Sequence, residues 1–148
     1  MVDRLIFERL QNRKKSTLLL GPRQVGKSTL CRGLEPSFTL NLAEEGTYLR
    51  YLKDPGQLRR TLKGRSVSSH DAPTMICIDE VQRVPALLNE IQVLLDEPDC
   101  PWRFYLTGSS ARKLKRGSAN FLPGRIILEY LDPLSCLEIS QRNFDLDL

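Results

Sequence analysis

The chain has 148 residues, of which 41% are hydrophobic and 27% charged, and its formal net charge is +4. This length and composition predict one globular domain. No apolar run approaches the roughly 20 residues that cross a bilayer, so the sequence excludes a membrane span. The amino terminus mixes charged with apolar side chains and lacks a signal cleavage site, so we expect a cytoplasmic protein.

Helices and strands are expected to alternate along the chain. The first half is expected to hold helices at residues 3–11, 27–32, 44–53 and 57–63, strands at 17–20 and 38–42, and then a polar loop at 64–73. The second half is expected to hold strands at 75–78, 104–106 and 125–131, and helices from Pro85 to before Pro98, at 111–115 and at 133–139. This alternation predicts an α/β fold with a parallel sheet covered on both faces, since right-handed crossovers place each helix against a face.

The cysteines and the histidine offer little for metal chemistry. Cys31, Cys77, Cys100 and Cys136 lie far apart in the sequence, without the close spacing of a zinc knuckle or a redox motif, so we expect reduced thiols. His70 is the single histidine and lies in a polar stretch, where an exposed loop position is the ordinary interpretation.

Basic residues gather in two windows. Residues 9–34 hold seven Lys or Arg and no acid, and residues 100–128 hold six and no acid. Such windows attract either the phosphates of a nucleotide or a nucleic-acid backbone, and charge alone does not distinguish the two.

Residues 21–28 read Gly-Pro-Arg-Gln-Val-Gly-Lys-Ser, which matches the phosphate-binding (Walker A) pattern G-x-x-x-x-G-K-[ST] between a predicted strand and a predicted helix. Glycine lets the backbone curl so that successive N–H groups face phosphates. Lys27 is expected to contact the β and γ phosphates, and Ser28 to bind Mg²⁺. The expected nucleotide-binding residues are Gly21, Pro22, Arg23, Gln24, Val25, Gly26, Lys27, Ser28 and Thr29. The competing interpretation is an ordinary turn before a helix.

An apolar strand ending in Asp79 and Glu80 resembles the Walker B partner of that loop. Asp79 is expected to hold Mg²⁺ through water, and Glu80 to activate the attacking water. Taken alone, an apolar run that ends in Asp-Glu indicates only a solvated strand end. Two adjacent acids favour a water-activating ATPase over a small-molecule kinase. No asparagine is followed by lysine, as the guanine-binding pattern requires, so ATP is the expected nucleotide.

Three blocks in this order are similar to the AAA+ superfamily: Leu-Leu-Leu-Gly-Pro-Arg-Gln-Val-Gly-Lys-Ser-Thr-Leu from Leu18, Ile-Asp-Glu-Val-Gln-Arg-Val-Pro from Ile78, and Leu-Thr-Gly-Ser-Ser-Ala-Arg-Lys-Leu from Leu106. They most resemble bacterial and archaeal ATP-binding proteins whose ATPase domain precedes a carboxyl-terminal domain of unknown function. The resemblance implies a five-stranded sheet in the order 5-1-4-3-2. Residues 1–148 are expected to form one ATP-binding core, and the expected absence of the following lid or carboxyl-terminal domain is a departure from the family pattern.

The resemblance further implies a sensor residue and an arginine finger. Ser109, with Thr107 as the alternative, matches the polar sensor that contacts the γ phosphate; the competing role is a cap on the next helix. Arg125, and after it Arg112, matches the arginine that a neighbouring subunit of a homo-oligomer supplies to the transition state. Solvation of a basic face or binding of nucleic-acid phosphates would account for the same arginines.

We therefore expect a Mg²⁺-dependent ATPase that couples its nucleotide state to a macromolecular partner. A nucleic-acid-binding module that uses the basic windows, with DNA as a possible partner, is a second hypothesis, although no helix-turn-helix, zinc-finger or RNA-binding aromatic pattern accompanies them. A regulatory fragment that binds ATP without turnover is the third.

Overall fold

In the computed structural model, residues 6–65, 72–109, 112, 114 and 124–135 are described. Five strands form one sheet in the order β2-β3-β4-β1-β5, and all four pairings are parallel. The strands are β1 (Ser16–Leu20), β2 (Phe38–Asn41), β3 (Thr74–Asp79), β4 (Trp102–Gly108) and β5 (Ile126–Tyr130). Read from the other edge, this is the order 5-1-4-3-2, so the predicted fold class and topology are confirmed.

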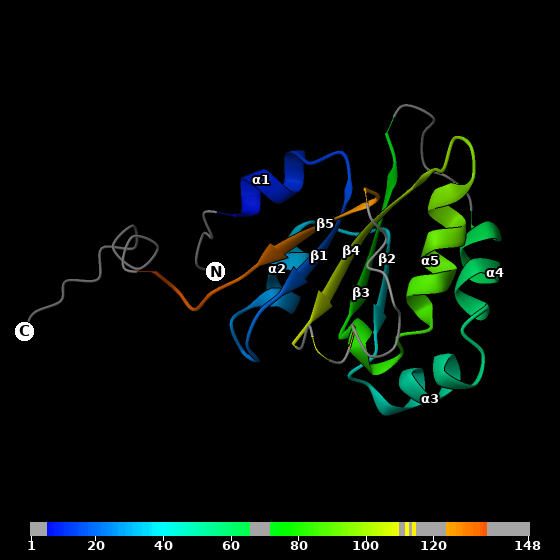
Figure 1. Ribbon diagram of the computed structural model, residues 1–148, viewed down its shortest axis with the longest axis horizontal. Helices are drawn as coiled ribbons and strands as arrows, with labels where there is room; N and C mark the ends of the chain where they lie inside the picture. Colours follow the sequence, from blue (N-terminus) through cyan, green and yellow to red (C-terminus); the bar gives the residue numbers. More distant parts are fainter. Residues whose placement is uncertain (1–5, 66–71, 110–111, 113, 115–123, 136–148) are drawn as a thin grey trace, which may run out of the picture.

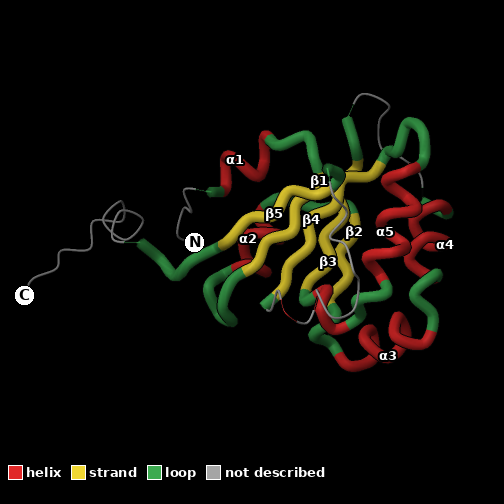
Figure 2. Tube along the Cα trace, in the orientation of Figure 1, coloured by secondary structure: helices red, strands yellow, loops and turns green. Residues whose placement is uncertain are grey.

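Helices cover both faces of this sheet (Figures 1 and 2). They are α1 (Phe7–Asn12), α2 (Lys27–Gly33), α3 (Glu45–Lys53), α4 (Gln57–Lys63), a 3-10 turn η1 (Val81–Arg83) and α5 (Leu87–Asp96). α3, α4 and α5 lie together beside β2 and β3, whereas α1 lies near β1 and β5.

The strand side chains alternate between two buried clusters, because successive residues of a strand point to opposite faces. Leu18, Leu20, Ile76 and Ile78 pack with the side chains of α4 and α5. Leu19, Cys77 and Tyr105 pack on the other face with α1 and α2. Every residue of β1 is buried, as expected for a central parallel strand with helices on both sides.

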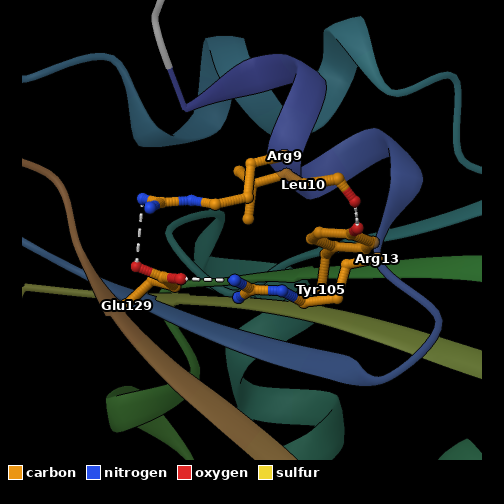
Figure 3. A network of polar contacts seen from close by, with 5 residues as sticks. All are labelled: Arg9, Leu10, Arg13, Tyr105 and Glu129. Carbon is orange, nitrogen blue, oxygen red and sulfur yellow. Dashed lines mark hydrogen bonds and ion pairs between the residues drawn. The ribbon is translucent and has the colours of Figure 1, made fainter.

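α1 is attached to the sheet by a polar network as well as by its buried Leu10 (Figure 3). The hydroxyl of Tyr105 on β4 donates to the carbonyl of Leu10. Arg9 and Arg13 pair with the Glu129 carboxylate on β5, at 3.4 Å and 2.5 Å. The segment before β1 is thereby joined to the two strands that flank β1.

The structure departs from the expected elements in a few places. β3 continues through Asp79, and η1 intervenes before α5, which begins at Leu87 rather than Pro85. Of the expected helix at 111–115, only Arg112 and Leu114 are described, and both are helical. In the expected helix at 133–139, residues 133–135 are not helical and the rest lies outside the described residues. None of the helices described here is long and apolar enough to cross a membrane.

Candidate functional site

The glycine-containing loop lies between β1 and α2, at the edge where the carboxyl ends of β1, β3 and β4 meet. Gly26 has a φ of 94°, in the left-handed region that favours glycine. Gly21 is required for another reason: a Cβ there would lie 2.2 Å from the carbonyl oxygen of Leu131. The two fixed glycines of the pattern therefore serve different purposes, backbone conformation at Gly26 and close approach to the chain after β5 at Gly21.

Lys27 is 4% exposed and turns back onto the loop. Its ammonium donates to the carbonyl oxygens of Gly21, at 2.9 Å, and Pro22, at 2.5 Å. Burial lowers the pKa of Lys27, and the nearby carboxylates of Glu80 and Asp79 oppose that shift without cancelling it. The buried Lys27 ammonium contacts neutral carbonyl oxygens, so an anion bound in their place would interact with it strongly.

Both oxygens of the buried Asp79 carboxylate are held by hydroxyl groups. Ser28 donates to Oδ2 at 2.5 Å, and Thr107 donates to Oδ1. Thr107 is fully buried, and its hydroxyl also accepts the backbone N–H of Glu80 at 3.0 Å. Thr107 thus orients Asp79 and Glu80 and does not face solvent. Ser109, the other sensor candidate, differs in being partly exposed.

The Ser28 and Asp79 oxygens are suitable ligands for Mg²⁺. Both are hard oxygen donors, and their contact brings α2 and β3 together at one point. Among the described residues there is no group of three or more His, Cys, Asp or Glu side chains able to hold a metal. A few protein oxygens completed by phosphate and water are the usual environment of Mg²⁺ beside a nucleotide.

Glu80 directly follows β3 and adopts φ 59° and ψ 45°, a left-handed conformation that is uncommon outside glycine. Its carboxylate accepts a hydrogen bond from the Ser109 hydroxyl at 3.3 Å. The side-chain nitrogen of Gln82 donates to the same carboxylate and, at 3.0 Å, to Ser109. The structure therefore brings together Glu80 and Ser109, both expected from the sequence, and adds Gln82, which was not.

A pocket of about 610 Å³ lies between the loop and Glu80. It is lined by Arg23, Gln24, Gly26, Lys27, Ser28, Thr29, Ala43, Glu80 and Arg83. Six of the lining residues belong to the predicted nucleotide-binding set, and Glu80 faces them. Three cationic side chains around one hollow provide a positive field suited to a polyphosphate.

Arg83 was missed by the sequence analysis. Its guanidinium donates to the carbonyls of Leu42, at 2.7 Å, and Ala43, at 3.2 Å, and lies 4.0 Å from the ring of Tyr48. The available signal was its position inside the second of the three family-like blocks, Ile-Asp-Glu-Val-Gln-Arg, but nothing in that block shows that the chain after β2 packs against Arg83.

Arg125 lies at the amino ends of the strands, whereas the loop lies at their carboxyl ends. It precedes β5, whose first residue is in register with Ser16, the first residue of β1. Its guanidinium pairs with Asp96 at 2.5 Å and donates to the carbonyl of Leu95 at 2.7 Å. Arg125 therefore does not reach the pocket of its own chain, and a role in a neighbouring subunit's site stays a prediction. Arg112 is exposed, and its immediate neighbours lie outside the described residues.

Comparisons with known proteins show what the chain is similar to. The model of a family described as "AAA domain" matches residues 13–140. "Uncharacterized protein Mb2031c" of Mycobacterium bovis and "Uncharacterized protein Rv2008c" of Mycobacterium tuberculosis are each 34% identical to the chain over 142 residues. Each alignment covers 94% of this chain and 30% of the relative, so the chain spans less than a third of the length of these curated relatives.

Proposed function

The chain belongs to the AAA domain family, and from this membership we propose that it binds ATP and hydrolyses it to ADP and phosphate with Mg²⁺. One observation carries the proposal: the loop, the buried Lys27 and the Glu80 carboxylate face one another across the same pocket. Neither an ordinary turn nor a solvated strand end requires that arrangement.

The phosphate chain of ATP would lie along the loop. Backbone N–H groups of residues 21–28 would contact its oxygens, and the ammonium of Lys27 would exchange the carbonyls of Gly21 and Pro22 for the β and γ phosphates. The Ser28 hydroxyl and, through water, the Asp79 carboxylate would hold Mg²⁺, which neutralises charge on the β and γ phosphates.

Glu80 would act as the general base. Its carboxylate would accept a proton from a water molecule as the water oxygen attacks the γ phosphorus and the bond to ADP breaks. Ser109, already in contact with Glu80, would sense the γ phosphate. Arg125 of a neighbouring subunit would stabilise the developing charge.

We also propose that nucleotide state is coupled to a macromolecular partner through α3. Arg83 lines the pocket, donates to the Ala43 carbonyl just before α3 and lies over the ring of Tyr48 on α3 itself. On the same helix, Leu49 is 54% exposed and Leu52 is 49% exposed. Exposed leucines on a helix that is tied to the nucleotide pocket suit a surface whose position responds to the nucleotide.

The DNA-binding hypothesis receives less support. In the basic windows, Arg9 and Arg13 are paired with Glu129, Arg125 is paired with Asp96, and Lys27 is buried. These residues have lost part of the free charge that counterion release from DNA requires. Retention on DNA that falls with added salt and survives Lys27→Ala would favour this alternative.

Calorimetric titration with MgATP and an assay of phosphate release test the proposal. The unsubstituted chain should bind ATP, and Lys27→Ala should lose binding. Glu80→Gln should retain binding and lose hydrolysis by about 100-fold or more, since only the water-activating step is removed. Equal affinity in the unsubstituted chain and Lys27→Ala would contradict the site. Binding without any phosphate release would favour the non-hydrolysing fragment.

A further inference from the structure

Gln82 is a buried polar residue that contacts Glu80 and Ser109. It lies in η1, three residues after Asp79, between the buried Val81 and the pocket-lining Arg83. Its side chain is 7% exposed, which is unusual for an amide unless hydrogen bonds hold it. The side-chain nitrogen supplies two hydrogens, and the structure gives it two acceptors, one on Glu80 and one on Ser109.

The orientation of this amide follows from its neighbours. An ionised Glu80 carboxylate only accepts hydrogen bonds, so the nitrogen of Gln82 must face it. The amide oxygen then lies against Gly108, where an added Cβ would be 3.0 Å away. That oxygen is buried without a hydrogen-bond partner among the described residues. The molecule therefore tolerates one unsatisfied carbonyl in order to present the nitrogen to Glu80 and Ser109.

The end of β4 is shaped to receive the amide. Thr107 holds Asp79 and the backbone of Glu80, Gly108 leaves space for Gln82, and Ser109 completes the contact with the Glu80 carboxylate. Three successive residues, 107 to 109 at the end of β4, thus lie against Asp79, Glu80 and Gln82 at the end of β3 and just after it. The buried Gln82 is a donor shared by Glu80 and Ser109.

We infer that Gln82 is a positioning residue that holds the Glu80 carboxylate and the Ser109 hydroxyl as one unit, so that movement of Ser109 on contact with a γ phosphate also moves the base. This inference rests on the proposed function. A base fixed by one hydrogen bond can rotate away from the attacking water, whereas a base fixed by two donors has one orientation.

Two substitutions separate hydrogen bonding from packing. Gln82→Met keeps the length and removes the donors, and Gln82→Glu keeps the shape and replaces the donors with acceptors. Both should leave the Kd for ATP within about threefold and lower kcat by roughly 10- to 100-fold, the range for loss of a hydrogen bond to a charged group. The exposed Gln92 of α5 supplies matched controls, Gln92→Met and Gln92→Glu, which should change neither quantity.

A double-substitution cycle tests whether Gln82 acts through Glu80. In a Glu80→Gln background, Gln82→Met should cause no further loss of kcat, because the group that it positions is already disabled. A purely structural role would give the same loss in both backgrounds. That result, or an unchanged kcat for Gln82→Met in an active chain, would overturn the inference.

The contact also has a spectroscopic readout that needs no turnover. The side-chain NH₂ signals of Gln82 in ¹H–¹⁵N spectra are identified by their loss in Gln82→Met. They should exchange with water more slowly than those of Gln92, and should shift in both Ser109→Ala and Glu80→Ala. Signals that ignore both substitutions would overturn the inference even in an active enzyme. Failure of the unsubstituted chain to bind ATP would instead overturn the proposed function, whether or not these signals shift.

Discussion

The hydroxyl of Ser28 donates a hydrogen bond of 2.5 Å to the Asp79 carboxylate, although the two residues are 51 positions apart in the chain. The contact joins the helix after the glycine loop to the end of β3. Thr107 holds the other carboxylate oxygen from β4, so three separate elements fix the orientation of one buried acid. The Ser28 hydroxyl and the Asp79 carboxylate are therefore already side by side where the proposed Mg²⁺ ligands are needed.

Asp79→Asn should remove most of the effect of Mg²⁺ on ATP binding. The amide keeps the shape of the carboxylate and loses its charge, so the residue no longer supports the metal through water. Loss of such an outer ligand commonly costs about 10- to 100-fold in metal affinity. Titrations with MgATP and with ATP plus EDTA measure the effect. Asp96→Asn, at the end of α5 beside Arg125, is the control. It should preserve the difference in ATP affinity with and without Mg²⁺.

Lys27→Met should abolish ATP binding and change how stability depends on pH. Burial lowers the pKa of Lys27 from the ordinary 10.5, which the unfolded chain retains. Between the two values the unfolded chain binds more protons, so the free energy of unfolding rises with pH in that window. The unsubstituted chain should therefore gain stability relative to Lys27→Met as the pH rises through this window toward 10.5. Urea unfolding without nucleotide at several pH values measures this difference. A difference that stays constant with pH would contradict the prediction.

Cys31 and Cys77 should resist alkylation in the folded chain. Cys31 on α2 and Cys77 on β3 lie in the same buried cluster. The hydrogen bond to Cys77 together with burial raises the pKa of Cys31. Because burial shields both sulfurs from the reagent, Cys31 and Cys77 should react more slowly than the half-buried Cys100. Mass spectrometry of peptides after brief treatment with iodoacetamide measures each site, and urea should remove the difference. Rapid labelling of Cys31 in the native chain would indicate that α2 separates readily from the sheet.

The sequence predicted the strands and helices that hold the phosphate loop because their signals are local. β1, α2 and β3 each carry an apolar run or helical period next to a recognisable motif, and a motif fixes which residues face the ligand. Gln82 and Arg83 were missed because each has partners distant in the sequence: Ser109, just after β4, for Gln82, and the chain after β2 for Arg83. Arg125 shows another limit: the register of β5 with β1 places it away from the pocket of its own chain, and whether it serves a neighbouring subunit depends on an assembly that one chain's sequence does not encode locally.

Gly21→Ala should destabilise the chain and weaken ATP binding, although φ at Gly21 is not in the left-handed region. The added Cβ would lie 2.2 Å from the Leu131 carbonyl oxygen, a backbone atom that cannot move aside alone, so β5 or the loop must shift. Such overpacking typically costs about 1–3 kcal/mol. Gly46→Ala is the matched control, because nothing lies within 4 Å of a Cβ there and alanine is the better helix former in α3. It should gain about 0.5–1 kcal/mol. Urea unfolding and ATP titration of both variants measure the contrast, and equal stability would mean that the chain after β5 does not pack against the loop.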